Sequence, residues 1–130
     1  MLLGLYPERE STSLSNVLFR DLLGISPDLR VLNPGSMLPE HQAIALQMAT
    51  RRLLSHEPIQ YIIGKTRFLD ADISVKPGVL IPRGETEQLV RWTIDRIKAL
   101  SPGNNLHILD VACGSGCIAT ALAMQFPTAR

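Results

Sequence analysis

The sequence predicts an α+β chain in three successive parts: a helical bundle over residues 1–56, a β-hairpin linker over 57–82, and the beginning of an α/β domain over 83–130. Three observations support this fold class. The first half carries apolar residues at helical spacing, the middle is rich in β-branched residues around a Pro-Gly turn, and the end reads as strand, glycine turn and helix.

Composition limits the classes of function. A chain of 130 residues can bury one ordinary core, or a helical module plus part of a second domain. The net charge of +1 provides neither a basic face for nucleic acid nor an acidic tail. No apolar run approaches the roughly 20 residues that span a bilayer, and the start lacks a basic leader with a cleavage site. We therefore expect a soluble, cytoplasmic protein.

The first predicted helix carries an apolar face at i, i+3, i+4 and i+8 spacing. This face consists of Leu14, Val17, Leu18 and Leu22. Serines before Leu14 are expected to cap its start and Gly24 to end it. The sequence "SPDL" from Ser26 predicts a second helix with a serine cap and proline at its first position.

A longer helix is predicted from Pro39 to about Ser55, after a turn at "NPG". Its expected apolar face consists of Ala45, Met48, Ala49 and Leu53. Arg51 and Arg52 come late in this helix, where cations suit the helix dipole. We interpret them as a solvated helix end.

The amino-acid composition changes from Glu57 onward, where "PIQYIIG" and "DADISVKPGVLIP" are rich in β-branched residues. Apolar and polar residues alternate over 72–75, and Pro-Gly at 77–78 supplies a turn. These features predict a hairpin in which 73–75 pairs with 79–81. Pro82 is expected to end the second strand, because proline cannot donate to a ladder.

The α/β part is predicted to contain an amphipathic helix over 85–100, a loop at "SPGNN", a buried strand over 107–111, and a helix that ends at Pro127. One strand and its helix cannot form a doubly wound sheet. We therefore expect the chain to stop inside its second domain and the exposed flank of the strand to favour self-association.

The stretch "LDVACGSGCIA" allows a ligand to approach the backbone and the amides at a helix start. Gly114, Gly116 and Ala119 fit a dinucleotide pattern. Asp110 favours a different ligand, S-adenosyl-L-methionine, because a carboxylate repels phosphate but attracts the methionyl ammonium. An Asp110 that merely caps the amides of the turn is the open alternative.

Cys113 and Cys117 lie four residues apart near His107. Three candidate ligands without a fourth make a poor zinc site, and the spacing is a poor framework for a secreted disulfide scaffold. We interpret both cysteines as small reduced side chains packed in a tight turn.

Together, "PIQYIIGKTRF", "VKPGVLIPRGETEQLV" and "ILDVACGSGCIATALA" resemble the protein-(glutamine-N5) methyltransferases that act on the Gly-Gly-Gln motif of peptide-chain release factors. The resemblance runs from about Leu5 to the end. It implies an N-terminal helical domain for substrate recognition, a β-hairpin linker and a Rossmann-like methyltransferase domain. It also implies S-adenosyl-L-methionine as cofactor and a release factor as protein partner, without membrane or direct nucleic-acid binding.

The resemblance places cofactor-binding residues in two segments, before and within the glycine turn. In the first, a hydroxyl and the helix-start amides suit the donor's carboxylate, with Arg83 adding charge or bracing the turn. The implied cofactor-binding residues are Pro82, Arg83, Glu85, Thr86, Asp110, Ala112, Cys113, Gly114, Ser115 and Gly116.

Two positions depart from the family pattern. Gly84 replaces a proline that would pre-set the turn. Ala112 replaces a glycine, which is tolerable only if this residue keeps a negative φ and the donor is not approached too closely, because an L-residue is disfavoured at positive φ.

The Asn-Pro-Pro-Tyr motif with which the family holds the substrate amide is absent from these 130 residues. No catalytic or metal-binding residue is therefore assigned, and we expect no methyl transfer and weak donor binding at most. A reading frame without that motif in the hundred or so residues past Arg130 would overturn the interpretation. The alternatives are a related methyltransferase of DNA adenine or an RNA base, a non-catalytic helical protein-binding module, or a folding unit alone.

Overall fold

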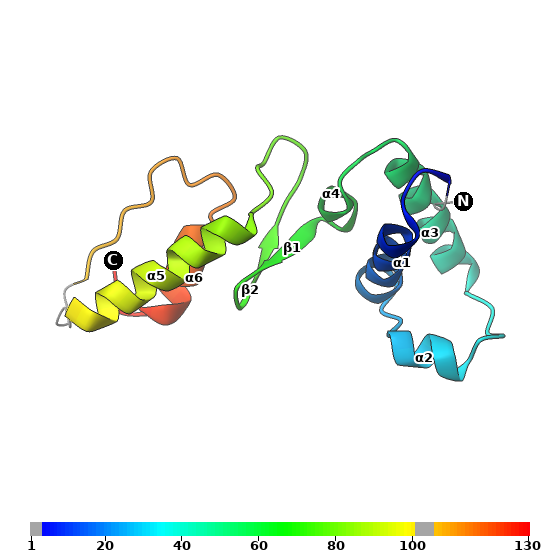
Figure 1. Ribbon diagram of the computed structural model, residues 1–130, viewed down its shortest axis with the longest axis horizontal. Helices are drawn as coiled ribbons and strands as arrows, with labels where there is room; N and C mark the ends of the chain where they lie inside the picture. The colour runs from blue at the N-terminus through cyan, green and yellow to red at the C-terminus, as the bar shows by residue number, and fades with distance from the viewer. Residues whose placement is uncertain (1–3, 101–105) are drawn as a thin grey trace. The chain divides into compact units, whose positions relative to one another are not determined.

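The computed structural model describes residues 4–100 and 106–130. The chain divides between Ile63 and Gly64 into two compact units, and each is described by itself. Figure 1 shows the elements in chain order, with helices alone before the division and a hairpin followed by two helices after it.

The first unit is helical, as the spacing of apolar residues predicts. Its elements are α1 (Glu8–Val17), the π-helical η2 (Leu18–Leu22), α2 (Pro27–Leu32), α3 (Glu40–Leu54) and α4 (Ile59–Ile63). Side chains from η2, α3 and α4 form its buried core: Leu18, Ala49, Leu53 and Ile62. Three of the four residues of the apolar face predicted for the first helix pack here, since Leu18 belongs to this core and Leu14 and Leu22 lie against it.

The first helix begins earlier than expected, at Glu8. Ser11 and Ser13, the serines before Leu14, lie inside the helix and do not cap it. The Ser11 hydroxyl donates to the carbonyl of Tyr6 at 3.2 Å, and the Ser15 hydroxyl donates to the carbonyl of Ser11 at 2.7 Å. The prediction for the other end is confirmed, because Gly24 follows η2 with a φ of 70°. Such a left-handed residue satisfies the last carbonyls of a helix.

The "SPDL" prediction is confirmed at α2. The hydroxyl of Ser26 caps the helix by accepting a hydrogen bond from the amide of Leu29 at 3.4 Å, and Pro27 occupies the first turn. The turn predicted after it is also present, since the amide of Ser36 donates to the carbonyl of Asn33 at 3.2 Å.

The α3 helix has nearly the predicted bounds, but its buried face is rotated. Ala49 and Leu53 are buried as expected, whereas Met48 is 61% exposed. Leu46 packs against the core instead. Residues 46, 49 and 53 follow i, i+3 and i+7 spacing and form a helical stripe next to the predicted one. The helices that pack against α3 determine which of the two stripes is buried.

The stretch "PIQYIIG" is a short helix, α4, rather than part of a β region. The amides of Tyr61 and Ile62 donate to the carbonyl of Pro58 at 3.0 and 3.3 Å. Ile59 and Ile63 pack around the core beside Ile62. The i, i+3, i+4 spacing of these isoleucines outweighs their β-branched composition, because it places all of them on the core face.

The second unit begins with a two-stranded antiparallel hairpin, β1 (Lys65–Phe68) and β2 (Ala71–Ser74), in which Thr66 pairs with Ile73. The predicted alternation is confirmed, since Ile73 and Val75 are buried between exposed polar neighbours. The predicted partner is wrong, because β2 pairs with 65–68 and not with 79–81.

The Pro-Gly turn nevertheless forms. The amide of Val79 donates to the carbonyl of Lys76 at 3.0 Å, and Gly78 has a φ of 91°. The chain then continues without a strand, and Leu80 is 68% exposed. The closer segment 65–68 already pairs with β2 through a two-residue turn, and so Pro82 has no strand to end.

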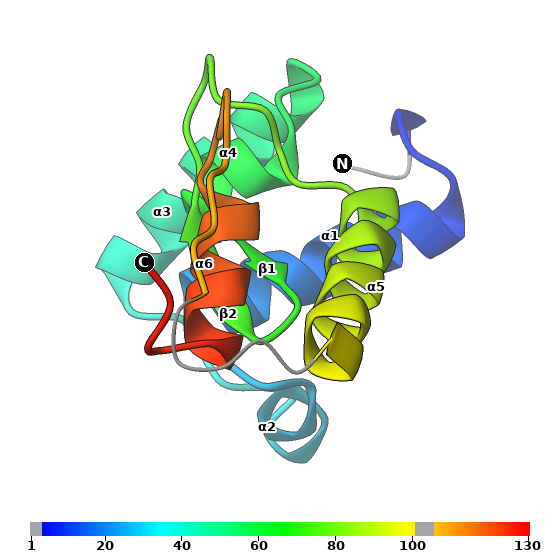
Figure 2. The same cartoon turned by 90° about the vertical axis from the view of Figure 1, so that its left-hand side faces the viewer.

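Two helices cover the hairpin: α5 (Gly84–Leu100) as predicted, and α6 (Cys117–Gln125). Figures 1 and 2 both show α5 and α6 side by side, and α6 also contacts β2. The buried side chains come from all four elements and the residue that follows β2: Phe68, Ala71, Ile73, Val75, Val90, Ile94, Cys117, Ala121 and Leu122.

The buried strand predicted at 107–111 does not form. Leu109 is 85% and Val111 77% exposed, and the segment is coil. Two backbone hydrogen bonds join this segment to Arg130. The amide of Ile108 donates to the carbonyl of Arg130 at 2.8 Å, and the amide of Arg130 donates to the carbonyl of Leu106 at 2.9 Å. This is the pattern of a parallel pair. One residue of pairing does not build a strand. The loop predicted at 101–105 lies outside the described residues.

None of the helices in the described ranges is long and apolar enough to cross a membrane. The longest is α5, whose 17 residues include several charged side chains.

Candidate functional site

The two segments singled out by the sequence precede α5 and α6. These helices pack against each other and run in the same direction, so both segments lie at the same end of the pair (Figures 1 and 2). Within the described ranges no backbone hydrogen bond joins 82–86 to 110–116. The structure thus gathers the predicted site residues at one end of the second unit, in two separate segments.

The glycine turn is built from residues in the left-handed region. Gly114 has a φ of 57° and Gly116 of 72°, and the amide of Gly116 closes the turn onto the carbonyl of Cys113 at 2.8 Å. Ala112 has a φ of 61°, so the condition of a negative φ is not met. Residues 111–112 and 114–115 lie in successive turns before α6, and Ala112 takes a left-handed conformation that glycine adopts without strain. That conformation costs an L-residue about 1–2 kcal/mol.

The start of α6 offers free amide donors. Gly116 is its N-cap residue and supplies no side-chain cap, while its carbonyl accepts from the amide of Thr120 at 2.9 Å. The amides of the first turn have no intrahelical acceptor. Because the helix dipole adds positive potential there, this end suits an anionic or electron-rich group.

Asp110 stands before this turn with one oxygen unsatisfied. Its Oδ2 is buried and has no hydrogen-bond partner in the described part of the chain. Asp110 lines a cavity of about 140 Å³ with Ala119 and Leu122 of α6 and with Arg130. A carboxylate oxygen that is shielded from water and unpaired is costly, so this position favours a cationic or hydrogen-bond-donating ligand.

The other segment opens α5. The carbonyl of Arg83 accepts from the amides of Thr86 at 3.0 Å and Glu87 at 3.3 Å. Pro82 and Thr86 are partly buried, whereas the side chains of Arg83 and Glu85 are exposed. A guanidinium and a hydroxyl therefore border the helix start, where a carboxylate can be bound.

Gly84, the departure from the family pattern in this segment, is the first residue of α5. A Cβ added there would meet no atom within 4 Å. Proline is well accepted at the first position of a helix. Both the open space and the helix position are therefore compatible with a proline at 84.

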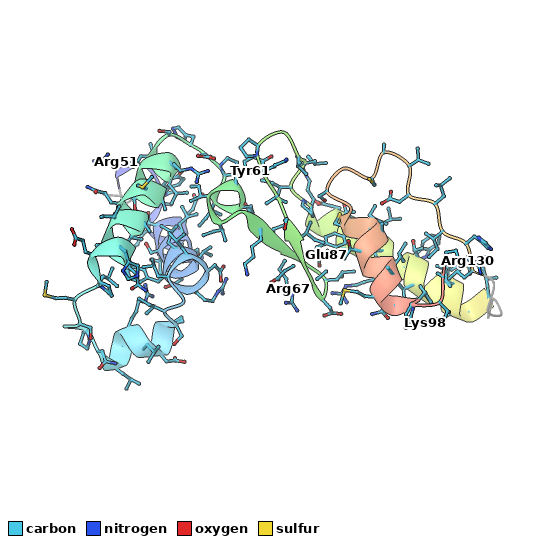
Figure 3. All side chains as sticks on the ribbon, turned by 180° about the vertical axis from the view of Figure 1, so that it is seen from behind. Arg51, Tyr61, Arg67, Glu87, Lys98 and Arg130 are labelled. Atoms are coloured by element: carbon cyan, nitrogen blue, oxygen red, sulfur yellow. The ribbon has the colours of Figure 1, made fainter. Side chains whose placement is uncertain are left out.

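Sequence reasoning missed Glu87. Its Oε1 accepts a hydrogen bond from the amide of Leu69 at 3.1 Å, which fixes the hairpin turn to α5 one residue after Thr86 (Figure 3). Leu69 has a φ of 50°, and this conformation belongs to the two-residue turn between β1 and β2. The misplaced hairpin hid the signal, because the turn was expected at 77–78.

The two cysteines differ in environment. Cys117 is buried in α6, as the packed interpretation requires, whereas Cys113 is exposed, so that interpretation was wrong for Cys113. Both thiols are free. Over the described ranges no group of three or more His, Cys, Asp or Glu residues is arranged to hold a metal ion.

Comparison with known proteins defines the first unit. Residues 6–64 match the sequence model of the PrmC N-terminal domain, and these bounds nearly coincide with the helical unit. The chain is thus a protein built on that domain, followed by a hairpin and a glycine-turn segment.

Relatives extend the match beyond this domain. A release factor glutamine methyltransferase of Flavobacterium psychrophilum is 36% identical over 128 residues, 98% of this chain and 45% of the relative. One of Thermodesulfovibrio yellowstonii is 44% identical over 90 residues, 69% of this chain and 32% of the relative. The human MTRF1L release factor glutamine methyltransferase is 38% identical over 98 residues, 72% of this chain and 29% of the relative. The chain belongs to the release factor glutamine methyltransferase family and spans less than half the length of these relatives.

Proposed function

We propose that this chain forms the release-factor-recognition domain and one wall of the cofactor pocket of an S-adenosyl-L-methionine-dependent protein-glutamine N-methyltransferase. The reaction is N5-methylation of the glutamine in the Gly-Gly-Gln motif of a peptide-chain release factor. The observation that carries the proposal is the buried Oδ2 of Asp110 before the glycine turn, which has no hydrogen-bond partner among the described residues. The names of the relatives support the reaction class.

The residues present fit this cofactor. The carboxylate of Asp110 suits the methionyl ammonium, which would supply the missing hydrogen-bond donor. The cofactor's carboxylate suits the free amides at the start of α6 or the Arg83 end of α5. When bound, S-adenosyl-L-methionine supplies an electrophilic methyl group carried on a sulfonium.

Within this reaction the chain's own contribution is positioning. A glutamine amide is a weak nucleophile, so transfer depends on alignment and on the electrostatic environment of the reacting atoms. The 82–86 and 110–116 segments fix one side of the cofactor. The first unit binds the protein substrate, and no catalytic residue is assigned to residues 1–130.

Calorimetric titration of S-adenosyl-L-methionine into residues 1–130 tests the cofactor site. The wild-type chain should bind weakly, and Asp110→Asn should lower the affinity at least tenfold, because the amide loses the charge that pairs with the ammonium. Asp95→Asn, a change of the same kind at an exposed position of α5, should leave affinity unchanged. Equal affinities in all three proteins would reject the assignment of Asp110.

A chimera tests the reaction. Residues 1–130 are joined to the remaining part of the F. psychrophilum relative, and the release factor is analysed by mass spectrometry after incubation with S-adenosyl-L-methionine. One added methyl group on the Gly-Gly-Gln glutamine is expected, with the unaltered relative as the positive control. Methylation of adenine-containing DNA or of RNA instead would support the nucleic-acid alternative, which the net charge of +1 disfavours.

A further inference from the structure

A cavity of about 670 Å³ in the first unit takes no part in the cofactor site. Residues of α1, η2, α2, α3 and the loop that precedes α3 line it. Its apolar lining consists of Leu18, Phe19, Leu38, Ala43 and Leu46. The space is large enough for side chains of a second molecule, and its apolar lining favours an aliphatic or aromatic group.

Arg30 is the only charged residue among the described residues that line this cavity. Its guanidinium stacks over the Phe19 ring, 4.7 Å from the ring centroid, and its Nη2 donates to Oδ1 of Asn16. Its Nε is buried and has no acceptor in the described part of the chain. Arginine is always protonated, so this side chain is a full positive charge with only a neutral amide oxygen as a hydrogen-bond acceptor.

The hydroxyl groups that line the cavity are already committed to the backbone. Thr12 donates to the carbonyl of Glu8 at 2.9 Å, and Thr50 to the carbonyl of Leu46 at 2.7 Å. Ser15 likewise donates within its own helix. The charge of Arg30 is therefore the strongest polar determinant of what enters the cavity.

We infer that this cavity binds an apolar side chain and an adjoining carboxylate on a segment of the protein partner. The apolar lining would contact the apolar side chain, and the guanidinium of Arg30 would pair with the carboxylate. Phe19 and Asn16 hold the guanidinium in place, so little rotamer entropy is lost when a carboxylate binds beside it. The identity of that partner as a release factor rests on the proposed function, whereas the chemistry of the cavity does not.

Two small peptides test this chemistry without a release factor or cofactor. Acetyl-Leu-Glu-amide and acetyl-Leu-Gln-amide differ only in the carboxylate, and each is titrated into ¹⁵N-labelled residues 1–130. The Glu peptide should shift the backbone amide signals of 11–19 and 43–50 and bind at least tenfold more tightly than the Gln peptide. Equal affinities, no binding of the Glu peptide, or the same shifts with inorganic phosphate would overturn the inference.

Variants assign the effect to Arg30. Arg30→Met should abolish the preference for the Glu peptide, and Arg30→Lys, which keeps the charge but not the planar fork, should retain part of it. Arg51→Met removes an exposed arginine of α3 outside the cavity and should change nothing (Figure 3). Thermal unfolding of each variant checks the fold. A preference that survives in folded Arg30→Met would overturn the role of Arg30.

Two further measurements separate this inference from the proposed function. Arg30→Met should bind S-adenosyl-L-methionine as the wild type does, because the cofactor segments lie in the other unit. It should bind release factor at least tenfold more weakly than the wild type. Equal binding of release factor by both proteins would overturn the cavity as the partner site, whereas no binding by the wild type would reject the release factor as partner and leave the peptide result standing.

Discussion

Ala112 is the residue at which local conformation and residue type disagree. It takes a φ of 61° in a turn whose other left-handed positions, 114 and 116, are glycines. An L-residue pays for this conformation through contact between its Cβ and the backbone, at about 1–2 kcal/mol. The second unit therefore carries a local strain that a single substitution can remove.

Ala112→Gly should stabilise the second unit by about 1 kcal/mol, because glycine adopts positive φ without that contact, less the entropy glycine gains in the unfolded chain. Chemical denaturation of both proteins measures the difference. Ala123→Gly is the matched control at an exposed position of α6, and it should destabilise by about 1 kcal/mol. If both substitutions lowered the free energy of unfolding, the strain at Ala112 would be contradicted.

Glu57 is a residue whose ionisation the structure perturbs. Arg52 forms a two-pronged ion pair with it, at 2.6 Å from Nε to Oε2 and 2.5 Å from Nη2 to Oε1. The hydrogen bonds from Arg52 lower the pKa of Glu57 below its ordinary value of 4.5. The solvated helix end expected at Arg52 is therefore also a link between α3 and the segment that leads to α4.

The stability contributed by this pair should be present above the unfolded pKa of Glu57 and lost as pH falls through the lowered folded value. Glu57→Gln should thus be less stable than the wild type at neutral pH, and the difference should vanish in acid. NMR titration should give a pKa for the Glu57 carboxyl below 4.5 in the wild type and a higher one in Arg52→Met. An unchanged titration in that variant would show that the pair does not persist in solution.

At the scale of elements, Glu87 couples the hairpin to α5. The amide of Leu69 donates to its carboxylate at 3.1 Å, and both groups are partly buried. Glu87→Ala should destabilise the second unit by about 1.5–3 kcal/mol, the range for a hydrogen bond to a charged group. Hydrogen exchange of the β1 and β2 amides should accelerate with it. Glu87→Gln keeps an acceptor and should retain part of the stability.

The control for this prediction is Gln88→Ala, at the neighbouring exposed position of α5. It removes a side chain of similar size without touching the hairpin, so exchange of the β1 and β2 amides should not change. Equal exchange rates in Glu87→Ala and Gln88→Ala would mean that the hairpin keeps its place without this carboxylate.

The wrong predictions of the hairpin partner and of a strand at 107–111 have a common origin. Helices with a long apolar stripe, such as 40–54 and 84–100, follow from the sequence because their periodicity is local. The hairpin partner does not, since 65–68 is polar in composition and becomes a strand only because β2 lies beside it. The segment 107–111 shows the opposite error, because it was predicted to be a strand and is coil. Its composition is that of a buried strand, but within the described ranges Arg130 is the residue whose backbone hydrogen-bonds to its backbone.

At the scale of the whole molecule, each unit has a buried core of its own. Leu53, 1% exposed, belongs to the core of the first unit, and Phe68, also 1% exposed, to the core of the second. Trp92, the only tryptophan of the chain, lies exposed on α5 and can report on the second unit. The two units should therefore lose stability separately when one core is damaged.

Leu53→Ala should destabilise the first unit by about 2–5 kcal/mol through lost burial and the cavity left behind. The NMR signals of α1 and α3 should disappear at lower denaturant concentration than in the wild type, while the Trp92 indole signal keeps its midpoint. Equal shifts of both sets of signals would mean that the two units unfold as one.

The sequence by itself determined the order of helical part, hairpin and glycine turn, the apolar periodicity of the long helices, and the residues proposed to hold the cofactor, because each depends on neighbours within a few residues. Tertiary structure decided the hairpin register, the positive φ of Ala112, the burial of Oδ2 of Asp110, and the position of Arg30 in the wall of a largely apolar cavity. These depend on pairing and burial between residues distant in the chain, which a one-dimensional pattern does not specify.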